Sequence, residues 1–211
     1  ALIFVGLPWE KEGKLYNVAA AVQGGELLGL VPKTCLPNYG EFYELRHFAP
    51  GNEEADAVWV EFAGREGDYV PFGTNLLFTC PELPGLSVAA EICEDVWVPN
   101  PPSIRHALAG ATVIVNLSAS DETTSKDIYR EALIGGQSAR LVCGYVYANA
   151  GEGESSQDLV FGGHNLIAEN GKILSRSARF KNETVYADLD IARITGERRR
   201  MTTFYAKSDV I

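Results

Sequence analysis

The stretch GLSVAAEICEDVWVP, residues 85–99, combines a buried strand with a reactive side chain at its end. Residues 85–92 form a near-continuous apolar run, which is typical of a strand buried on both faces. Cys93 follows this run directly, and two acids, Glu94 and Asp95, come next. A thiol in this position is presented at the end of a sheet, where α/β folds place reactive groups. The alternative interpretation is that Cys93 is a small buried apolar residue.

Apolar runs, turn residues and helical spacing along the chain predict an α/β domain in which strands dominate. Strands are expected at residues 2–9, 15–23, 27–33, 58–64, 69–78, 85–92, 111–120, 141–150 and 185–194. Helices are expected at residues 101–111 and 125–141, with a further basic helical turn after the last strand. The Asn170-Gly171 pair between two apolar runs predicts a β-hairpin within residues 164–180.

Composition limits the kinds of partner that this protein can have. The 211 residues are 46% hydrophobic with a formal net charge of -10, which suits one domain with a sizeable core and argues against a nucleic-acid partner. No apolar run approaches the roughly 20 residues that a membrane span needs. The cysteines match no zinc pattern, so we expect no metal site and a reducing, cytoplasmic location. They are Cys35, Cys80, Cys93 and Cys143.

Two charged residues between the third and fourth strands are candidates for chemistry. Lys33 ends an apolar strand, where its ammonium could lower a thiol pKa and stabilise an oxyanion. The alternative is a surface lysine that extends to solvent. Glu41 lies eight residues further on, among Tyr39, Phe42 and Tyr43. A carboxylate in such aromatic surroundings is either paired with another group or has a shifted pKa that suits it to catalysis. The alternative interpretation is that Glu41 is a surface residue of a loop.

Taken together, four segments resemble the carbon–nitrogen hydrolase (nitrilase) superfamily, and more narrowly the N-terminal glutaminase domains of bacterial glutamine-dependent NAD synthetases. They are VPKTCLPNYGEFYE (31–44), AAEICEDVWVP (89–99), NLSAS (116–120) and YVYANAGEGESSQDLVFGGH (145–164). The AGEGES sequence within the last segment favours the NAD synthetase branch. The resemblance runs from about Val5 to about Phe204 and implies a four-layered α-β-β-α sandwich of the nitrilase type.

The resemblance implies a cysteine hydrolase that uses a Glu–Lys–Cys triad. Cys93 would be the nucleophile that attacks the side-chain amide of glutamine and forms a thioester. Lys33 would stabilise the tetrahedral intermediate, and Glu41 would be the additional active-site glutamate of the superfamily.

The resemblance also implies residues that bind glutamine. The matching positions are Tyr39, Glu94, Ser120 and Lys126. The last of these is usually an arginine in the family. Lysine keeps the positive charge but loses the bidentate fork that grips a carboxylate.

The general base of the family is a glutamate on a segment well upstream of the catalytic lysine. Only 32 residues precede Lys33, and Glu10, Glu12 and Glu26 match no part of that motif. We therefore expect residues 1–211 to form a carbon–nitrogen hydrolase (glutamine amidotransferase) domain that lacks its first segment, so that the sandwich is incomplete at the N-terminus. The synthetase domain is expected to be absent from this chain, because no SGGxDS-type pyrophosphate-binding loop occurs.

The implied function is hydrolysis of glutamine to supply ammonia for the ATP-dependent amidation of nicotinic acid adenine dinucleotide to NAD. The expected partners are L-glutamine, a C-terminal synthetase domain and further copies of the same chain in a homo-oligomer. No cofactor is expected in this domain, whereas ATP and Mg²⁺ would serve the synthetase domain. Two alternatives stay open: a stand-alone amidase or carbamoylase of the same superfamily, and an inactive truncated module.

Overall fold

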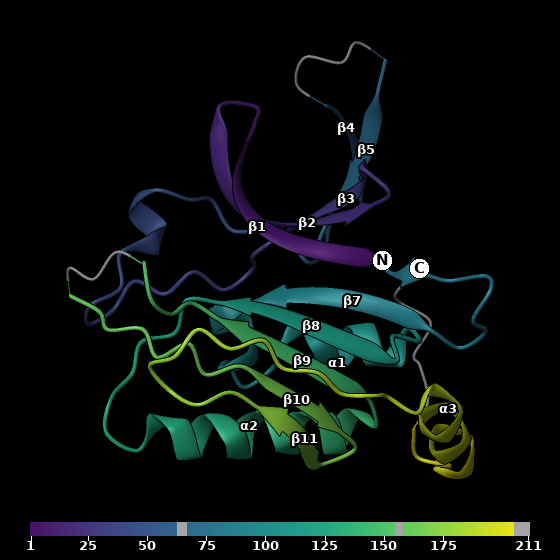
Figure 1. Cartoon of the computed structure of the whole chain (residues 1–211). Coiled ribbons are helices and arrows are strands. Elements are labelled where there is room, and N and C mark those ends of the chain that lie inside the picture. The colour runs from purple at the N-terminus through teal and green to yellow at the C-terminus, as the bar shows by residue number, and fades with distance from the viewer. Residues whose placement is uncertain (63–66, 155–157, 205–211) are drawn as a thin grey trace.

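The computed structural model describes residues 1–62, 67–154 and 158–204, which build two β-sheets stacked face to face (Figure 1). The first sheet has five strands in the order β1-β2-β3-β5-β4. Its strands are β1 (Leu2–Lys11), β2 (Lys14–Gln23), β3 (Glu26–Pro32), β4 (Val58–Glu61) and β5 (Tyr69–Phe72). Strands β1 to β3 form an antiparallel meander, as the short turns between them require.

The second sheet has six strands in the order β11-β10-β9-β8-β7-β6. They are β6 (Phe78–Thr79), β7 (Ser87–Ile92), β8 (Val113–Ser118), β9 (Gly144–Asn149), β10 (Leu166–Glu169) and β11 (Lys172–Arg176). Strands β7, β8 and β9 are parallel, so each connection between them needs a crossover. Helices α1 (Pro102–Leu108) and α2 (Lys126–Leu141) supply these crossovers. Helix α3 (Ile191–Arg200) follows the last strand, and no helix in the described ranges is long and apolar enough to cross a membrane.

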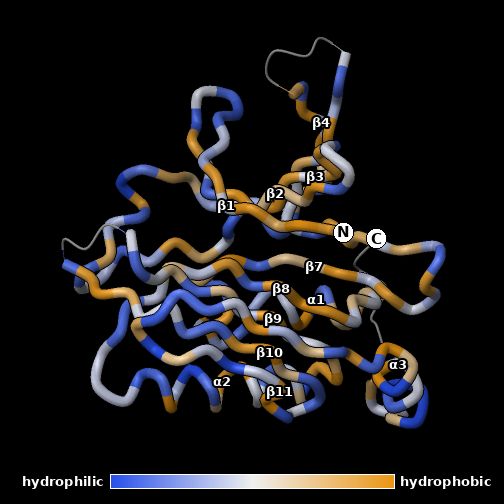
Figure 2. The backbone as a smooth tube through the Cα atoms, in the orientation of Figure 1, coloured by the Kyte–Doolittle hydropathy of each residue, from blue (hydrophilic) through white to orange (hydrophobic). Residues whose placement is uncertain are grey.

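Strand β7 separates two cores because its side chains alternate between the faces of the sheet. Ala90 and Ile92 face the first sheet, where they pack with Ala19 and Val31. Ala89 faces the helices and packs in the larger cluster that α1 and α2 cover. All six residues of β7 are buried, which explains the continuous apolar run in the sequence. Figure 2 shows the corresponding apolar strands in the middle of the molecule.

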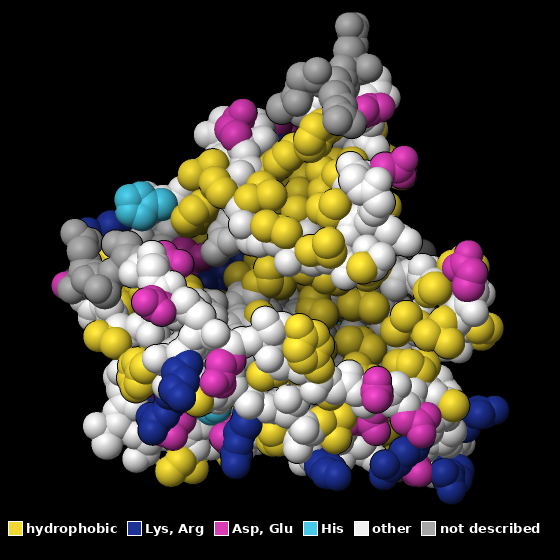
Figure 3. All heavy atoms as spheres, in the orientation of Figure 1, with side chains coloured by type: hydrophobic (Ala, Val, Ile, Leu, Met, Phe, Trp, Pro, Cys, Tyr) yellow, Lys and Arg dark blue, Asp and Glu magenta, His cyan; other side chains and the backbone are white. Residues whose placement is uncertain are grey.

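The outer face of the first sheet is also apolar. Val18, Leu30 and Phe72 form the centre of this face. Figure 3 shows hydrophobic side chains gathered in a hollow between the β1–β2 and β4–β5 hairpins. These side chains line a cavity of about 740 Å³. No described helix lies on this face. The predicted α/β fold with stacked sheets is confirmed, and three layers of the expected four-layered sandwich lie within the described residues.

The structure confirms most of the predicted elements, including the hairpin at Asn170-Gly171. The predicted strand at residues 185–194 is wrong, because this segment pairs with no described strand and becomes helix α3 at Ile191. Its apolar side chains pack without strand pairing: Leu189 lies so close to Gly144 that a Cβ there would be 2.6 Å from it. Val185 and Leu189 are partly buried whereas Tyr186 is exposed, so the alternation of apolar residues indicated the side that faces the protein and not strand pairing.

One guanidinium of helix α3 binds several backbone oxygens at the ends of the two crossover segments. Arg198 donates hydrogen bonds to the backbone oxygens of Val142, Ala111 and Leu141, at 3.0, 2.7 and 2.9 Å. Leu141 and Val142 lie at the end of α2, Ala111 follows α1, and Nη1 of Arg198 also lies 3.5 Å from the oxygen of Ala107 in the last turn of α1. The last turn of a helix leaves its oxygens without intrahelical partners. The guanidinium also lies 4.7 Å from the centre of the Phe204 ring. One side chain thus satisfies the ends of two helices.

Replacing Arg198 by alanine should lower the free energy of unfolding by about 2–4 kcal/mol, because several partly buried carbonyls lose their donor. Chemical denaturation measures this change. Arg199, which is exposed on the same helix, provides the matched control, and its replacement by alanine should have little effect. Equal destabilisation by the two variants would contradict the role of Arg198.

Candidate active site

Cys93 is presented by a sharp turn at the end of β7. It opens the 3-10 turn η2 (Cys93–Val96) with a backbone φ of 47°, a left-handed conformation that costs a non-glycine residue about 1–2 kcal/mol. The turn directs the thiol away from the helix side and toward the space between the sheets, where it packs beside Ile92 and Leu117. Its backbone N–H donates to Oδ1 of Asn116 at 3.1 Å, which helps to hold the strained residue.

Lys33 is not a surface lysine, since its side chain is only 2% exposed. It follows the last residue of β3, and its ammonium forms an ion pair with Glu44 at the start of the 3-10 turn η1 (Glu44–Arg46). The second oxygen of Glu44 accepts a hydrogen bond of 2.8 Å from Nδ2 of Asn17 on β2. A buried ammonium is tolerated only with such a partner, so Glu44 and Lys33 act as one unit.

The thiol and the ion pair open into the same cavity, which has a volume of about 560 Å³. This is within the usual range for small-molecule sites. Its described lining residues are Phe4, Gly6, Asn17, Lys33, Pro37, Phe42, Glu44, Ile92, Cys93, Leu117, Ser118, Ala119, Ala148, Asn149, Ala150 and Glu154. The cavity lies at the ends of β3, β7, β8 and β9, so both sheets contribute to it.

Opposing effects set the ionisation of the nucleophile. Burial raises the pKa of the Cys93 thiol, and the carboxylate of Glu44 adds to this rise. The ammonium of Lys33, the backbone N–H of Ala119 and the Ser118 hydroxyl lower it. The other buried thiols lack this balance: burial raises the pKa of Cys35 and of Cys143 to about 12. Cys93 therefore combines a nearby ammonium with two hydrogen-bond donors that offset part of its burial, a combination that Cys35 and Cys143 lack.

Asp95 ties the lysine segment to the nucleophile turn. Its Oδ1 accepts from the backbone N–H of Cys35 at 2.7 Å and from the Thr34 backbone N–H and hydroxyl at 3.2 and 3.0 Å. Its Oδ2 accepts from the N–H of Ile92 at 2.9 Å. The residues on either side of the cavity are therefore bound to one carboxylate, which is 1% exposed.

Of the four residues predicted to bind glutamine, Tyr39 and Glu94 contact each other, whereas Lys126 and Ser120 have other partners. The Tyr39 hydroxyl donates to Glu94 at 2.6 Å, and this contact raises the pKa of Tyr39. Lys126 forms an ion pair with Asp121, and its ammonium lies 5.4 Å from the centre of the Trp97 ring.

Ser120 is buried, and its backbone exchanges hydrogen bonds with the side chain of Asn149, which lines the cavity. None of the four predicted binding residues is itself among those that line it.

Glu44 is the site residue that the sequence prediction missed. Glu41, which was predicted instead, is partly buried and has no hydrogen bond or ion pair with Lys33 in the described part of the chain. The signal in the sequence was ambiguous, because Glu41 and Glu44 both lie in the same short segment after the lysine. Only the turn at residues 44–46 decides which carboxylate faces the ammonium. The role of Glu41 stays a prediction.

Three upstream acids were predicted not to serve as the base. Glu10 and Glu12 lie at the end of the β1–β2 hairpin, and Glu26 begins β3. None of them lines the cavity that holds the thiol. Within the described ranges, no group of three or more His, Cys, Asp or Glu side chains could hold a metal ion. Of the glycine-rich loop at residues 150–164, Ala150 and Glu154 line the cavity, while residues 155–157 lie outside the described residues.

Comparison with known proteins places this geometry in a family. The carbon-nitrogen hydrolase family profile matches residues 1–199. The chain is 45% identical over 205 residues to the glutamine-dependent NAD(+) synthetase of Mycobacterium tuberculosis, an alignment that covers 96% of this chain and 30% of that protein. The chain therefore spans about a third of the length of the curated relatives that it matches.

Solved structures agree with this result. A glutamine-dependent NAD(+) synthetase from Cytophaga hutchinsonii matches with a TM-score of 0.74 and 30% sequence identity, over 88% of this chain and 29% of that one. A carbon-nitrogen hydrolase from Helicobacter pylori matches with a TM-score of 0.71 over 95% of this chain and 66% of that one. Its 18% identity shows a shared fold alone.

Lys33 and Glu44 should shift the reactivity of Cys93 in opposite directions. Replacing Lys33 by methionine removes a charge that lowers the thiol pKa, so alkylation by iodoacetamide at a fixed pH below that pKa should slow severalfold. Replacing Glu44 by glutamine removes a charge that raises the pKa, so the rate at the same pH should increase. Alkylation rates measured against pH test both. The exposed Lys14, replaced by methionine, is the control, and shifts in the same direction would contradict these assignments.

Replacing Asp95 by asparagine should weaken the hydrogen bonds that hold the lysine segment against the turn at Cys93. The amide nitrogen of asparagine must face either the backbone N–H of Ile92 or the backbone N–H groups of Thr34 and Cys35, and no N–H group can accept its hydrogens. We expect a lower melting temperature and alkylation of Cys93 slowed about tenfold, as for other residues that support a reactive group. Thermal unfolding and labelling kinetics measure these effects. The exposed Asp188, replaced by asparagine, should leave both unchanged, and an unaltered D95N protein would rule out the role of Asp95.

Proposed function

Because the chain belongs to the carbon–nitrogen hydrolase family, we propose that it is the glutaminase part of a glutamine-dependent NAD synthetase. The observation that carries the proposal is the buried Lys33–Glu44 pair beside Cys93 in one cavity. This arrangement supplies a nucleophile and a cation that can stabilise an oxyanion, as amide hydrolysis requires. The sequence identity to NAD synthetases supports glutamine as the amide.

In the proposed reaction, the thiolate of Cys93 attacks the side-chain carboxamide carbon of glutamine. The carbonyl oxygen takes the negative charge, which the Lys33 ammonium stabilises. Collapse of the tetrahedral intermediate breaks the C–N bond, and the nitrogen leaves as ammonia after it accepts a proton. Water then cleaves the thioester, which yields glutamate and restores the thiol.

The proton transfers need a general base. Both oxygens of Glu44 are engaged, one by Lys33 and the other by Asn17, so we assign Glu44 to holding the lysine. We propose that the base is a glutamate from outside residues 1–211, since no glutamate before Lys33 matches the motif of the family. The chain by itself should then turn over glutamine weakly or not at all, because acylation and thioester hydrolysis both need a proton transfer.

For substrate binding, we propose that Glu94 and Tyr39 receive the α-amino group of glutamine and that Lys126 receives its α-carboxylate, with Ser120 nearby. The Lys126 ammonium is already paired with Asp121, so the substrate carboxylate would share it. Lysine makes one point contact where arginine would make two parallel hydrogen bonds. This pairing should weaken the grip on the α-carboxylate.

The proposal also covers the partners of this chain. The ammonia would pass to a synthetase domain of the same protein, which would use ATP and Mg²⁺ to amidate nicotinic acid adenine dinucleotide, and no cofactor is assigned to residues 1–211. Exposed apolar side chains such as Trp59 and Ile3 are compatible with assembly into a homo-oligomer. All four cysteines are free, which supports a cytoplasmic location.

An electrophilic analogue of glutamine, such as its diazo-ketone, tests the proposal directly. Intact mass and peptide mapping should reveal a single adduct on Cys93, and excess glutamine should block it. The variant in which Cys93 is replaced by alanine should show no adduct that excess glutamine blocks, because the other cysteines do not line the cavity. Protection by other amides but not by glutamine would instead favour a stand-alone amidase or carbamoylase. Absence of any adduct on Cys93 would support an inactive module.

A further inference from the structure

A buried carboxylate that the proposed reaction does not use lies beneath the nucleophile. Glu91 precedes Cys93 by two residues on β7, and its side chain is on the face of the sheet that the helices cover. It is 1% exposed, as is Asn116 on β8, while Tyr145 on β9 is fully buried. Glu91 and Asn116 are direct partners in the parallel pairing of β7 with β8. Three polar groups from adjacent strands therefore meet inside an otherwise apolar core.

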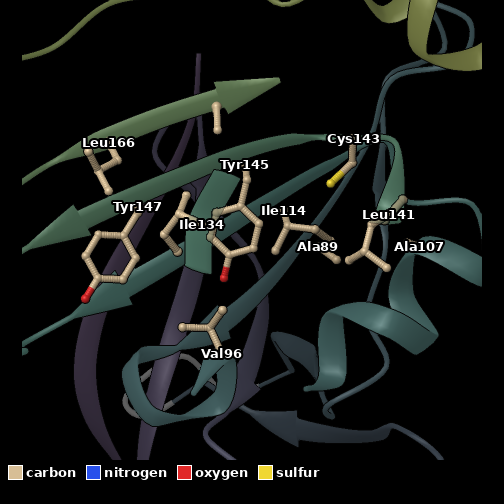
Figure 4. Close-up of a cluster of buried hydrophobic side chains, with 12 residues drawn as sticks. Ala89, Val96, Ala107, Ile114, Ile134, Leu141, Cys143, Tyr145, Tyr147 and Leu166 are labelled. Atoms are coloured by element: carbon tan, nitrogen blue, oxygen red, sulfur yellow. The ribbon is translucent and has the colours of Figure 1, made fainter. Parts of the chain in front are cut away.

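Hydrogen bonds join these groups to the nucleophile. The Tyr145 hydroxyl donates to Oε1 of Glu91. Nδ2 of Asn116 donates to the Tyr145 oxygen at 3.3 Å. Oδ1 of Asn116 in turn accepts from the backbone N–H of Cys93 at 3.1 Å and from the Ser118 hydroxyl at 2.6 Å. Figure 4 shows the Tyr145 ring extending from β9 with its hydroxyl directed toward the turn that carries Val96, which is the turn that Cys93 begins.

The direction of these bonds follows from the carboxylate. An ionised carboxylate only accepts hydrogen bonds, so the single hydroxyl proton of Tyr145 must point to Glu91. The tyrosine oxygen is then left to accept, and the amide nitrogen of Asn116 must face it. This orientation turns the amide oxygen of Asn116 toward the N–H of Cys93. A neutral acid at position 91 could donate to Tyr145, and the order of donors and acceptors would no longer be determined.

We propose that Glu91 is a positioning residue for the nucleophile: acting through Tyr145 and Asn116, its carboxylate sets the direction of the hydrogen bonds that hold the backbone of the reactive thiol. This role rests on the proposed function, in which that thiol attacks an amide. It explains why an acid is placed in the core although apolar side chains would fill the same space at less cost in desolvation.

The surroundings of Glu91 make its ionisation sensitive to pH. Burial raises its pKa to about 7, and the negative charge of Asp95 adds to the rise, while hydrogen bonds from Tyr145 and from the backbone N–H of Ser103 oppose it. Cys143 and Tyr145 are further titratable groups that interact with Glu91. From α2, Gln137 donates to the Ser103 hydroxyl and brings no charge. As the pH falls through about 7, Glu91 gains a proton and the directed order of hydrogen bonds is lost.

Two variants test this role in the 211-residue protein. Replacing Glu91 by glutamine keeps the size of the side chain but supplies donors, and replacing Tyr145 by phenylalanine removes the link while the bond between Glu91 and Ser103 remains. With the diazo-ketone analogue of glutamine, we expect each variant to lower the maximal labelling rate about tenfold without changing the half-saturating concentration. The control replaces the buried Thr112, which precedes β8 and contacts the start of β7, by valine. This change removes bonds to Ser87 and Gly85 and should reduce thermal stability alone.

A second readout separates positioning from general destabilisation and from the identity of the substrate. Iodoacetamide reacts with the thiolate irrespective of a glutamine pocket, so the logarithm of its rate should rise linearly with pH below the thiol pKa. In the unmodified protein the slope should steepen below pH 7, where Glu91 becomes protonated, and in the E91Q variant it should not. A steeper slope below pH 7 in the unmodified protein, and its loss in the E91Q variant, support the role of Glu91. They do so even if the glutamine analogue labels neither protein. Absence of labelling by the analogue would overturn only the proposed substrate.

Some outcomes would overturn the inference. If E91Q and Y145F both keep the labelling rate and the pH slope of the unmodified protein, the carboxylate merely fills space. If E91Q fails to fold, the Y145F variant decides alone, because it leaves the Glu91 carboxylate bound to Ser103. A change in half-saturating concentration at constant maximal rate would also contradict the proposal, since it would assign Glu91 to substrate binding.

Discussion

The carboxylate of Asp95 holds the two halves of the cavity together. Its four hydrogen bonds reach the segment after β3, which belongs to the first sheet, and the end of β7, which belongs to the second. A buried charge that loses such partners is strongly destabilising, so the lysine segment and the nucleophile turn have little freedom to separate. The apolar contacts between the sheets stabilise the fold but do not depend on the orientation of individual groups. The hydrogen bonds of Asp95 do depend on orientation, so they determine how the lysine segment lies against the turn that begins at Cys93.

Burial of charge has a consistent pattern around the thiol. Lys33 is neutralised by Glu44, Lys126 by Asp121, and the carboxylates of Asp95 and Glu91 by backbone N–H groups and hydroxyls. Lys33 is therefore available to the thiol without an unpaired charge in the core. The pKa of the Cys93 thiol is raised by burial and by Glu44, and it is lowered by the Lys33 ammonium and by the donors of Ala119 and Ser118.

The two faces of the first sheet differ in what covers them. The inner face packs on β7 and β8 and forms one wall of the cavity. The outer face carries a second apolar cluster and a hollow that Figure 3 shows lined with hydrophobic side chains. Sheets with two apolar faces are typical of the interior of layered α/β folds, so the residues of this sheet suit a position between two layers.

Local patterns in the sequence determined most of the elements and placed Cys93 at the end of a strand. The apolar run before Cys93 specified a buried strand, and the position of Lys33 after another apolar strand placed it at a strand end, because periodicity and turn residues act between near neighbours. The sequence could not identify Glu44 as the partner of Lys33, the link from Asp95 to Thr34, or the unpaired course of residues 185–190. These depend on contacts between residues far apart in the chain, or on which of two nearby carboxylates a turn directs inward. Only the tertiary structure decides such contacts, because burial makes a partner obligatory for a charge but does not specify which residue supplies it.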